Sequence, residues 1–204
     1  MVATDGHRLA HVEKSEALED VSEEIKVLVP KKAMGELVRM IAEGTEAESI
    51  GFSRDDTHLF FDIGSRLLIS RMLTGQFPNY EAVLPRANDR TFTIDREEIT
   101  AAIRRVAILS DERSKTVKIA VTNGSLEITA SHSDLGEAHE TLEIDYNKED
   151  LQVGFNYQYL LDFLGTTDEP EISFEFKDSE SAAQLRTQPA TDYNYRYVVM
   201  PMRI

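Results

Sequence analysis

The strongest constraint on the fold is a pattern of three helical stretches separated by many short strand-like runs. Apolar residues recur at helical spacing over 30–42, over 95–110 and again after Asn156. The segments between them are rich in β-branched and aromatic residues, alternate apolar with polar positions and are bounded by turn residues. The pattern therefore predicts an α+β protein built from antiparallel sheets and a few helices.

Local signals mark the ends of several of these elements. Asn123-Gly124 is a strong hairpin turn signal. Asp95, with Glu98 three residues later, is typical of a helix start, and Asn156 suits the same capping role. The strands predicted on this basis are 2–4, 8–12, 25–29, 48–53, 59–63, 66–73, 91–94, 115–121, 126–131, 138–146, 151–155, 171–176, 182–186 and 195–202.

A long internal repeat predicts duplicated units. Asn156 lies 126 positions after Pro30, and this shift places Met34, Leu37 and Val38 on Leu160, Phe163 and Leu164. A repeat of this length is too long for a solenoid and indicates duplicated domains. We expect residues 1–76 to form the later half of one domain, 77–89 to be a linker containing proline and polar residues, and 90–204 to form a complete domain.

Composition limits the classes of function. The formal net charge of −15 argues against a conventional nucleic-acid binder, so any DNA contact must be local. The absence of cysteine excludes disulfides and thiolate metal sites, and the five histidines have no metal-ligand spacing, so we expect no metal and no cofactor. We find no apolar run long enough to span a membrane and no secretory signal, which predicts a cytoplasmic protein without a membrane partner.

Three separate segments carry a family resemblance. They read ATDGHRLA at 3–10, GQFPNY at 75–80 followed by VLP at 83–85, and YVVMPMRI at 197–204. Together, and in this order, they resemble the bacterial DNA polymerase sliding clamp, the beta subunit of DNA polymerase III. The resemblance implies the sliding-clamp fold, in which antiparallel sheets form the outside of a ring and helices line its inner face.

The resemblance also implies a function and partners. Family members are non-catalytic processivity factors: two full-length chains of three domains close head to tail around duplex DNA and hold it without sequence specificity. Their partners are the DNA polymerase III alpha subunit, clamp-loader subunits and other proteins that carry a clamp-binding motif. By this comparison we expect the chain to hold the last half of the middle domain and all of the third, and to be unable to close a ring by itself. We further expect a location in the cytoplasm, associated with the nucleoid.

The family binds short partner peptides in an apolar groove that the three segments line. Methionine, valine, leucine and proline would offer an adaptable surface for a partner's leucine or phenylalanine, while Arg8, His7 and exposed backbone groups would orient the peptide. Ala82 departs from the family, in which arginine can occupy this position. The implied groove residues are Thr4, Gly6, His7, Arg8, Leu9, Pro78, Val83, Val198, Val199, Met200, Pro201, Met202 and Arg203, with Asn156 and Tyr159 at the edge.

Basic residues on two of the helices suggest a local DNA-facing surface. Phosphate attraction there would be independent of sequence. The alternative is an ordinary solvated helix face, with Glu36 pairing Lys32. The resemblance also places Ile108 and Leu109 at the interface that closes the ring. The cations concerned are Lys31, Lys32 and Arg39 on the first helix and Arg104 and Arg105 on the second, with Arg113 and Lys115 after it.

Other functions remain open on the sequence alone. Residues 198–200 would also suit a buried final strand, and residues 5–7 an ordinary turn. A hydrolase or nuclease using Asp5 and His7 is a second possibility, although no nucleophile motif, phosphate loop or metal set accompanies them. A third is a protein-interaction module that keeps the peptide groove but has no DNA role.

Overall fold

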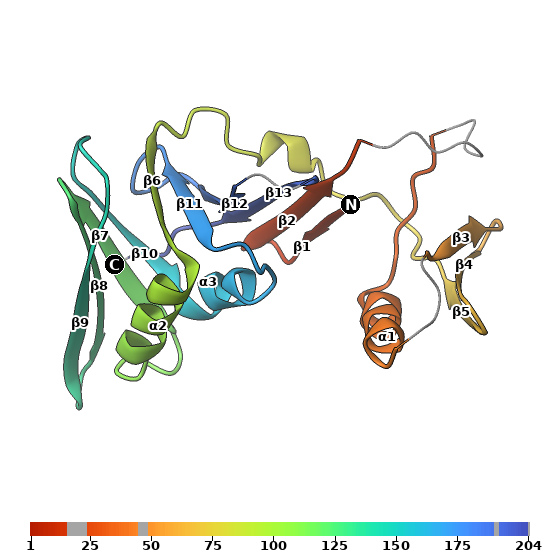
Figure 1. Cartoon of the computed structure of the whole chain (residues 1–204), viewed down its shortest axis with the longest axis horizontal. Helices are drawn as coiled ribbons and strands as arrows, with labels where there is room; N and C mark the ends of the chain where they lie inside the picture. The colour runs from red at the N-terminus through yellow and green to blue at the C-terminus, as the bar shows by residue number, and fades with distance from the viewer. Residues whose placement is uncertain (16–23, 45–48, 190–191, 204) are drawn as a thin grey trace. The chain divides into compact units, whose positions relative to one another are not determined.

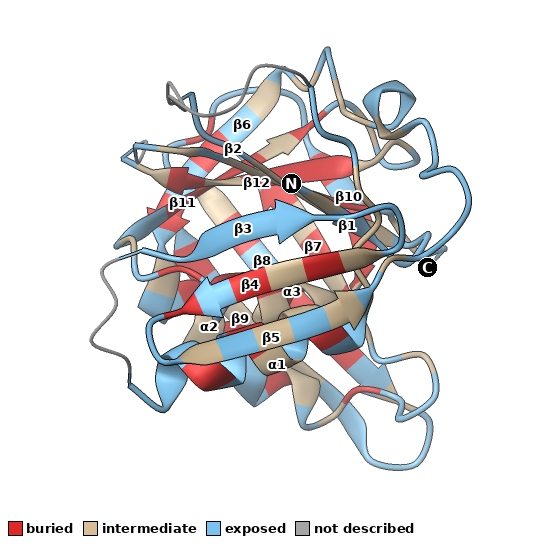
Figure 2. Cartoon of the chain, turned by 90° about the vertical axis from the view of Figure 1, so that its right-hand side faces the viewer, coloured by how far each residue is buried: buried red, intermediate tan, exposed pale blue. Residues whose placement is uncertain are grey.

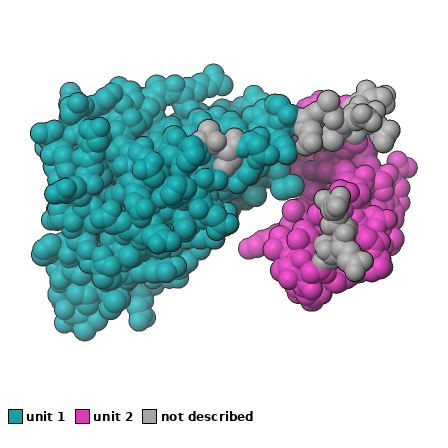
Figure 3. All heavy atoms as spheres, viewed as in Figure 1, with its two compact units in different colours: residues 1–16, 81–204 teal, residues 17–80 magenta. Residues whose placement is uncertain are grey.

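The chain divides into two compact units in the computed structural model, which describes residues 1–15, 24–44, 49–189 and 192–203. Unit 1 comprises Met1–Glu16 and Glu81–Ile204, and unit 2 comprises Ala17–Tyr80 (Figure 3). Each unit has its own hydrophobic core. The two units are therefore described separately.

The described residues of unit 1 form two antiparallel sheets and two α-helices (Figure 1). The helices are α2 (Arg96–Ala107) and α3 (Tyr157–Leu164), which pack against each other. The six-stranded sheet has the order β1 (Val2–Thr4), β2 (Arg8–Glu13), β13 (Asn194–Val199), β12 (Ala183–Gln188), β11 (Glu171–Phe176) and β6 (Arg90–Asp95). The four-stranded sheet has the order β10 (Leu151–Asn156), β7 (Thr116–Thr122), β8 (Ser125–His132) and β9 (Gly136–Glu143).

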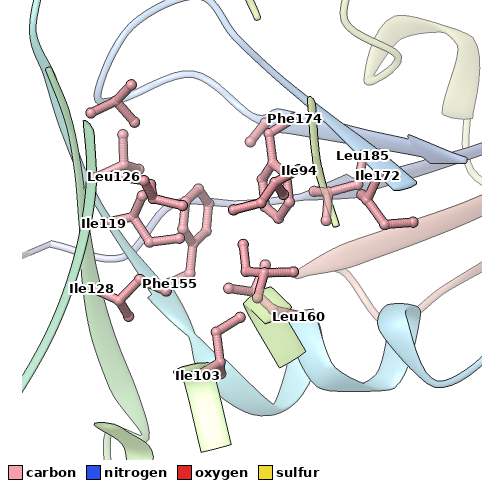
Figure 4. Close-up of a cluster of buried hydrophobic side chains, with 14 of the residues drawn as sticks. Ile94, Ile103, Ile119, Leu126, Ile128, Phe155, Leu160, Ile172, Phe174 and Leu185 are labelled. Atoms are coloured by element: carbon pink, nitrogen blue, oxygen red, sulfur yellow. The ribbon is translucent and has the colours of Figure 1, made fainter. Parts of the chain in front are cut away.

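One continuous core joins both sheets and both helices of unit 1. Figure 4 shows side chains of the two sheets pointing toward one another, with Ile103 of α2 and Leu160 of α3 closing one side. The capping signals are confirmed: the Asp95 side chain accepts a hydrogen bond from the Glu98 N–H, and the Asn156 side chain accepts one from the Gln158 N–H. These caps fix where each helix leaves its strand.

The β1–β2 hairpin joins the six-stranded sheet although it lies at the other end of the sequence. β2 pairs antiparallel with β13, with Leu9 opposite Val198 and Arg8 opposite Val199. The described residues 1–15 consequently belong to unit 1, whereas the predicted segment 1–76 groups them with the residues of unit 2. This pairing brings the hairpin turn next to the end of β13.

Unit 2 is a smaller layer of one helix on three strands. Helix α1 (Lys31–Ala42) packs on a sheet of order β3 (Gly51–Arg54), β4 (His58–Ile63) and β5 (Arg66–Arg71). Figure 2 shows buried residues at every second position of β4, as the predicted alternation requires. The buried core contains Leu37, Met40, Leu59, Phe61 and Ile63.

One predicted strand is wrong. Residues 25–29 form no strand, although they are rich in valine and leucine. Val27 and Val29 instead pack their side chains against the core of unit 2, while Leu28 accepts a single backbone hydrogen bond from Leu73. Valine side chains that favour a strand thus pack against the core although their backbone pairs with no neighbouring strand in the described part of the chain.

Several predicted boundaries also shift. The second helix ends at Ala107 instead of 110, and the predicted strands 138–146 and 195–202 end at Glu143 and Val199. Proline at 201 lacks the N–H that a continuing ladder needs. The predicted strand 48–53 begins at Gly51, and its first residue lies outside the described part of the chain. Among the described residues, no helix is long and apolar enough to cross a membrane.

Candidate functional site

The turn between β1 and β2 is held in one conformation by its own side chains. The Thr4 hydroxyl donates to the Arg8 carbonyl over 2.7 Å and accepts from the Gly6 N–H over 3.1 Å. One Asp5 carboxylate oxygen accepts from the N–H groups of both His7 and Arg8, each over 3.1 Å. Gly6 has a φ of 89°, which a side chain would strain. The turn therefore presents Gly6 and His7 to solvent from a fixed backbone.

The C-terminal segment is fastened to this turn. Directly after β13, the Met200 N–H donates to the His7 carbonyl over 2.9 Å. Two residues later, the Met202 N–H donates to the Gly154 carbonyl of β10 over 2.8 Å. Met200 keeps 41% of its surface exposed, Pro201 and Met202 are half-buried, and Arg203 is exposed. A short strip of methionine and proline thus lies beside the turn.

Arg8 is the centre of an ionic and aromatic network. Its Nε donates to Asp5 Oδ2 over 3.0 Å, and its Nη1 donates to Asp162 Oδ2 over 2.6 Å and to the Tyr197 hydroxyl over 3.3 Å. The guanidinium carbon lies 4.4 Å from the centre of the Tyr159 ring, a cation–π arrangement. Four side chains, supplied by α3, β13 and the hairpin turn, therefore surround a single guanidinium group.

The network shifts the pKa values of Arg8, Asp162 and Tyr197. Burial lowers the pKa of Arg8, but its hydrogen bonds to Asp162, Tyr197 and Asp5 raise that pKa above the ordinary value. Burial raises the pKa of Asp162, yet the bonds from Arg8 and Gln158 leave it below the ordinary value. Burial raises the pKa of Tyr197 to about 12, so its hydroxyl stays protonated.

Tyr159 connects α3 to the hairpin turn. Its ring stacks against His7, with centroids 6.5 Å apart and planes at 21°. Its carbonyl accepts a 2.9 Å hydrogen bond from the Tyr197 hydroxyl. Because Asn156 caps the start of α3, the helix that carries Tyr159 is itself fixed at its N-terminus.

The linker is pinned to the six-stranded sheet after the 3-10 helix Tyr80–Ala82. The Pro85 carbonyl accepts a 3.0 Å hydrogen bond from Arg196, and the Asn88 side chain donates to backbone carbonyls of Glu175 and Ala182. Val83 is exposed within this segment. The predicted residue Pro78 belongs to unit 2 and is exposed there.

Not all of the predicted groove residues offer a surface. Thr4, Gly6, His7, Arg8 and Met200 are brought together by the hydrogen bonds above. In contrast, three apolar residues predicted for the same surface are buried in unit 1 instead of facing solvent, and only Val199 among them belongs to its core cluster. These are Leu9, Val198 and Val199, with 3%, 1% and 0% of their surface exposed.

Two residues of the Arg8 network escape prediction from the sequence. Asp162 lies 154 positions from Arg8, and Tyr197 lies 189 positions away. Asp162 shares a helical face with Tyr159, three positions earlier, and this spacing is the only local signal. The partnership itself depends on the pairing of β2 with β13.

The predicted DNA-facing cations divide into two groups. Arg39 pairs with Glu36 and Glu43 on its own helix, and Arg105 pairs with Glu140 of β9, with Nη2 2.9 Å from the carboxylate. The expected pairing of Glu36 with Lys32 is replaced by the Arg39 pair. Ion-pair partners within the described residues are absent for three exposed cations, Lys31, Lys32 and Arg104.

The predicted ring-closing residues follow the end of α2. Ile108 is 76% exposed, whereas Leu109 is half-buried.

No group of three or more His, Asp or Glu side chains within the described ranges is placed to hold a metal ion.

Comparison with known families decides the membership. The model for the central domain of the DNA polymerase III beta subunit matches residues 1–79, and the model for the C-terminal domain of the same protein matches residues 81–203. The chain belongs to the DNA polymerase III beta subunit family. The predicted family and the predicted sliding-clamp fold are thereby confirmed.

Individual relatives of the chain agree with this membership. It is 36% identical to the beta sliding clamp of Pseudomonas aeruginosa over 100% of its own length and 54% of the relative's. It is 37% identical to that of Caulobacter vibrioides, with 53% of the relative covered. The chain thus spans about half the length of these curated relatives.

Solved structures show the same fold. The sliding clamp of Pseudomonas aeruginosa bound to griselimycin superposes with a TM-score of 0.90 at 36% identity, covering 100% of this chain and 54% of that one. The sliding clamp of Bartonella birtlesii bound to griselimycin gives a TM-score of 0.92 at 34% identity, with 100% and 54% covered.

Proposed function

We propose that this chain acts as a sliding-clamp polypeptide, a non-catalytic processivity factor that tethers replication and repair proteins to duplex DNA through a peptide-binding groove. The observation that carries the proposal is the hydrogen bond between the Met200 N–H and the His7 carbonyl. It unites two of the three family segments in one surface. Family membership supports the polymerase and clamp-loader subunits as partners and a location with the nucleoid.

The chemistry of this surface suits an apolar peptide. Met200 is 41% exposed on a fixed backbone, and an unbranched thioether adapts its shape to leucine or phenylalanine side chains. His7 and Gly6 of the neighbouring turn offer polar groups for the peptide backbone. Binding would bury apolar surface at the strip and orient the peptide at the turn.

The charges favour a second candidate function, a peptide-binding module without a DNA role. Arg39 and Arg105 are already balanced by carboxylates. Of the five cations predicted on the two helices, this leaves Lys31, Lys32 and Arg104 without an ion pair among the described residues of a molecule of net charge −15. Phosphate attraction through so few cations would be weak and strongly salt-dependent. In this second function Ile108 would contribute no ring contact.

The test is titration of a fluorescent clamp-binding peptide, of the glutamine-plus-leucine-phenylalanine type, against the whole chain. We expect saturable binding that Met200→Ala weakens about tenfold, because an interface anchor commonly contributes more than about 1 kcal/mol. Leu135→Ala is the matched control, since Leu135 is also exposed and apolar but lies in the β8–β9 turn.

Two results would contradict the proposal. One is the absence of binding by a folded chain. The other is an equal loss of affinity in the Met200 and Leu135 variants, which would mean that the peptide sticks to exposed apolar side chains in general. A salt titration of DNA association by the same chain separates the two candidate functions.

A further inference from the structure

Arg8 is poorly placed to serve as a charged anchor for a ligand. Its guanidinium already contacts carboxylates from two different segments, Asp5 in the hairpin turn and Asp162 on α3. Two carboxylates around one guanidinium give this cluster a net negative charge. A peptide carboxylate would therefore be repelled, and the contacts of Arg8 serve the structure of the chain itself.

We propose that Asp162 is a positioning residue of the peptide groove, holding the Arg8 guanidinium on the Tyr159 ring and thereby fixing the His7–Met200 surface. The proposal rests on the peptide-binding function proposed above. Asp162 itself need not touch the peptide. It acts on the ligand surface through Arg8, which follows His7 directly in the turn.

Three contacts of Arg8 tie the turn to α3, and Asp162 supplies the only carboxylate among them. The first is the 2.6 Å bond between Arg8 and Asp162, and the second is the stack of Arg8 on Tyr159 at 4.4 Å. The third runs through Tyr197, whose hydroxyl accepts from Arg8 and donates to the Tyr159 carbonyl. Charged hydrogen bonds are the stronger kind, so loss of the first contact should loosen the other two.

Movement of the Arg8 guanidinium would affect the His7–Met200 surface through the Tyr159 ring. The Tyr159 ring contacts both Arg8 and His7, which stacks on it with centroids 6.5 Å apart. The His7 carbonyl in turn receives the Met200 N–H. Without Asp162, Arg8 would keep only Asp5 and the longer bond to the Tyr197 hydroxyl. We expect the guanidinium then to leave the Tyr159 ring, so that His7 and Met200 no longer share one fixed geometry.

Asp162 is suited to a clean substitution. Its side chain is 41% exposed, so asparagine creates neither a cavity nor a buried unpaired charge. Its other carboxylate oxygen accepts from Gln158, four residues earlier on the same helix, over 2.8 Å. The matched control is Glu140→Gln on β9 of the four-stranded sheet, which removes the carboxylate partner of another partly exposed arginine, Arg105 of α2.

The experiment is a double-mutant cycle read by peptide titration, with Asp162→Asn, Arg8→Gln and the double variant. We expect each single variant to lose about fivefold to tenfold in affinity, and the double variant to bind no more weakly than Arg8→Gln, because the two side chains act as a unit. Asp162→Glu, which keeps the carboxylate, should retain most of the affinity, and Glu140→Gln should bind like the parent chain. Losses that multiply in the double variant would overturn the positioning role.

A spectroscopic measurement reports positioning without any ligand. The stacked Tyr159 ring should shift the His7 ring protons upfield in the parent chain, and Asp162→Asn should return them toward their ordinary position. If the parent chain fails to bind peptide, the proposed function falls while this shift still tests the positioning of His7 by Asp162. If the parent chain binds and Asp162→Asn binds equally well with an unchanged shift, the positioning role falls and the function stands.

Discussion

Replacing Leu9 and replacing Met200 should have opposite consequences, although both residues were predicted for the same groove. Leu9 lies on β2 opposite Val198 and is 3% exposed, whereas Met200 is 41% exposed just past the end of β13. We expect Leu9→Ala to destabilise unit 1 and Met200→Ala to weaken peptide binding with little change in stability. The distinction separates residues that build the groove from residues that contact its ligand.

The magnitude follows from burial. Leu→Ala at a fully buried position costs about 2–5 kcal/mol, from lost transfer energy and the cavity left behind. Leu9 lies on β2, the second strand from the edge of the sheet, where partial collapse is possible, so a value of about 3 kcal/mol is reasonable. For a unit of this size, that lowers the melting temperature by roughly 6–12 °C. Substitution at an exposed position such as Met200 changes stability by about 0.5 kcal/mol.

Native-state hydrogen exchange of the β2 and β13 amides is the assay, because it reports the opening of this ladder independently of unit 2. Peptide titration of the same samples supplies the binding readout. The reasoning would be refuted if Leu9→Ala left the exchange of these amides unchanged while abolishing binding. It would equally fail if Met200→Ala destabilised the ladder as much as Leu9→Ala does.

Two further outcomes are expected. Replacing Lys31 and Lys32 with glutamine should weaken DNA association and reduce the slope of log affinity against log salt concentration by about one to two. Arg105→Gln should change the affinity and the slope little because that charge is already paired. Both are measured by fluorescence anisotropy between low and moderate salt. The folded-state pKa of Asp162 is depressed, so its contribution to stability is full above the unfolded pKa of about 4 and is lost as the pH falls through the lower folded value. Thermal unfolding followed from pH 5 downward should therefore show a smaller acid loss in Asp162→Asn than in the parent chain, and an equal loss would contradict the ion pair.

Local features of the fold were predictable because their causes lie within a few residues. The side chains of Asp95 and Asn156 cap the two helices of unit 1 as expected, and Asn123-Gly124 turns the β7–β8 hairpin with Gly124 at a φ of 74°. Residues 25–29 show the limit of this reasoning, since a β-prone sequence forms a strand only where an edge is available to pair with it.

The site was only partly predictable because its decisive contacts are nonlocal. The three family segments indicated the turn and the C-terminal strip, but residue type alone did not separate the buried Leu9 from the exposed Met200. The pairing of Arg8 with Asp162 and that of Arg105 with Glu140 depend on strand and helix packing across long sequence separations. Arg105 is neutralised by a carboxylate that helical periodicity could not assign to it, whereas Glu36 and Glu43, the partners of Arg39, lie three and four residues away on the same helix.

The internal repeat shows why equal sequence patterns need not give equal burial. Pro30 and Asn156, 126 positions apart, both occupy the N-cap of a helix, so the repeat holds at the level of local structure. Leu164 is nevertheless fully buried, whereas its counterpart Val38 is 60% exposed. The difference follows from the neighbours: α3 packs against α2, while α1 has no second helix beside it among the described residues of unit 2. An apolar position on an amphipathic helix thus becomes a core position only when a second helix covers the face that the sheet leaves open.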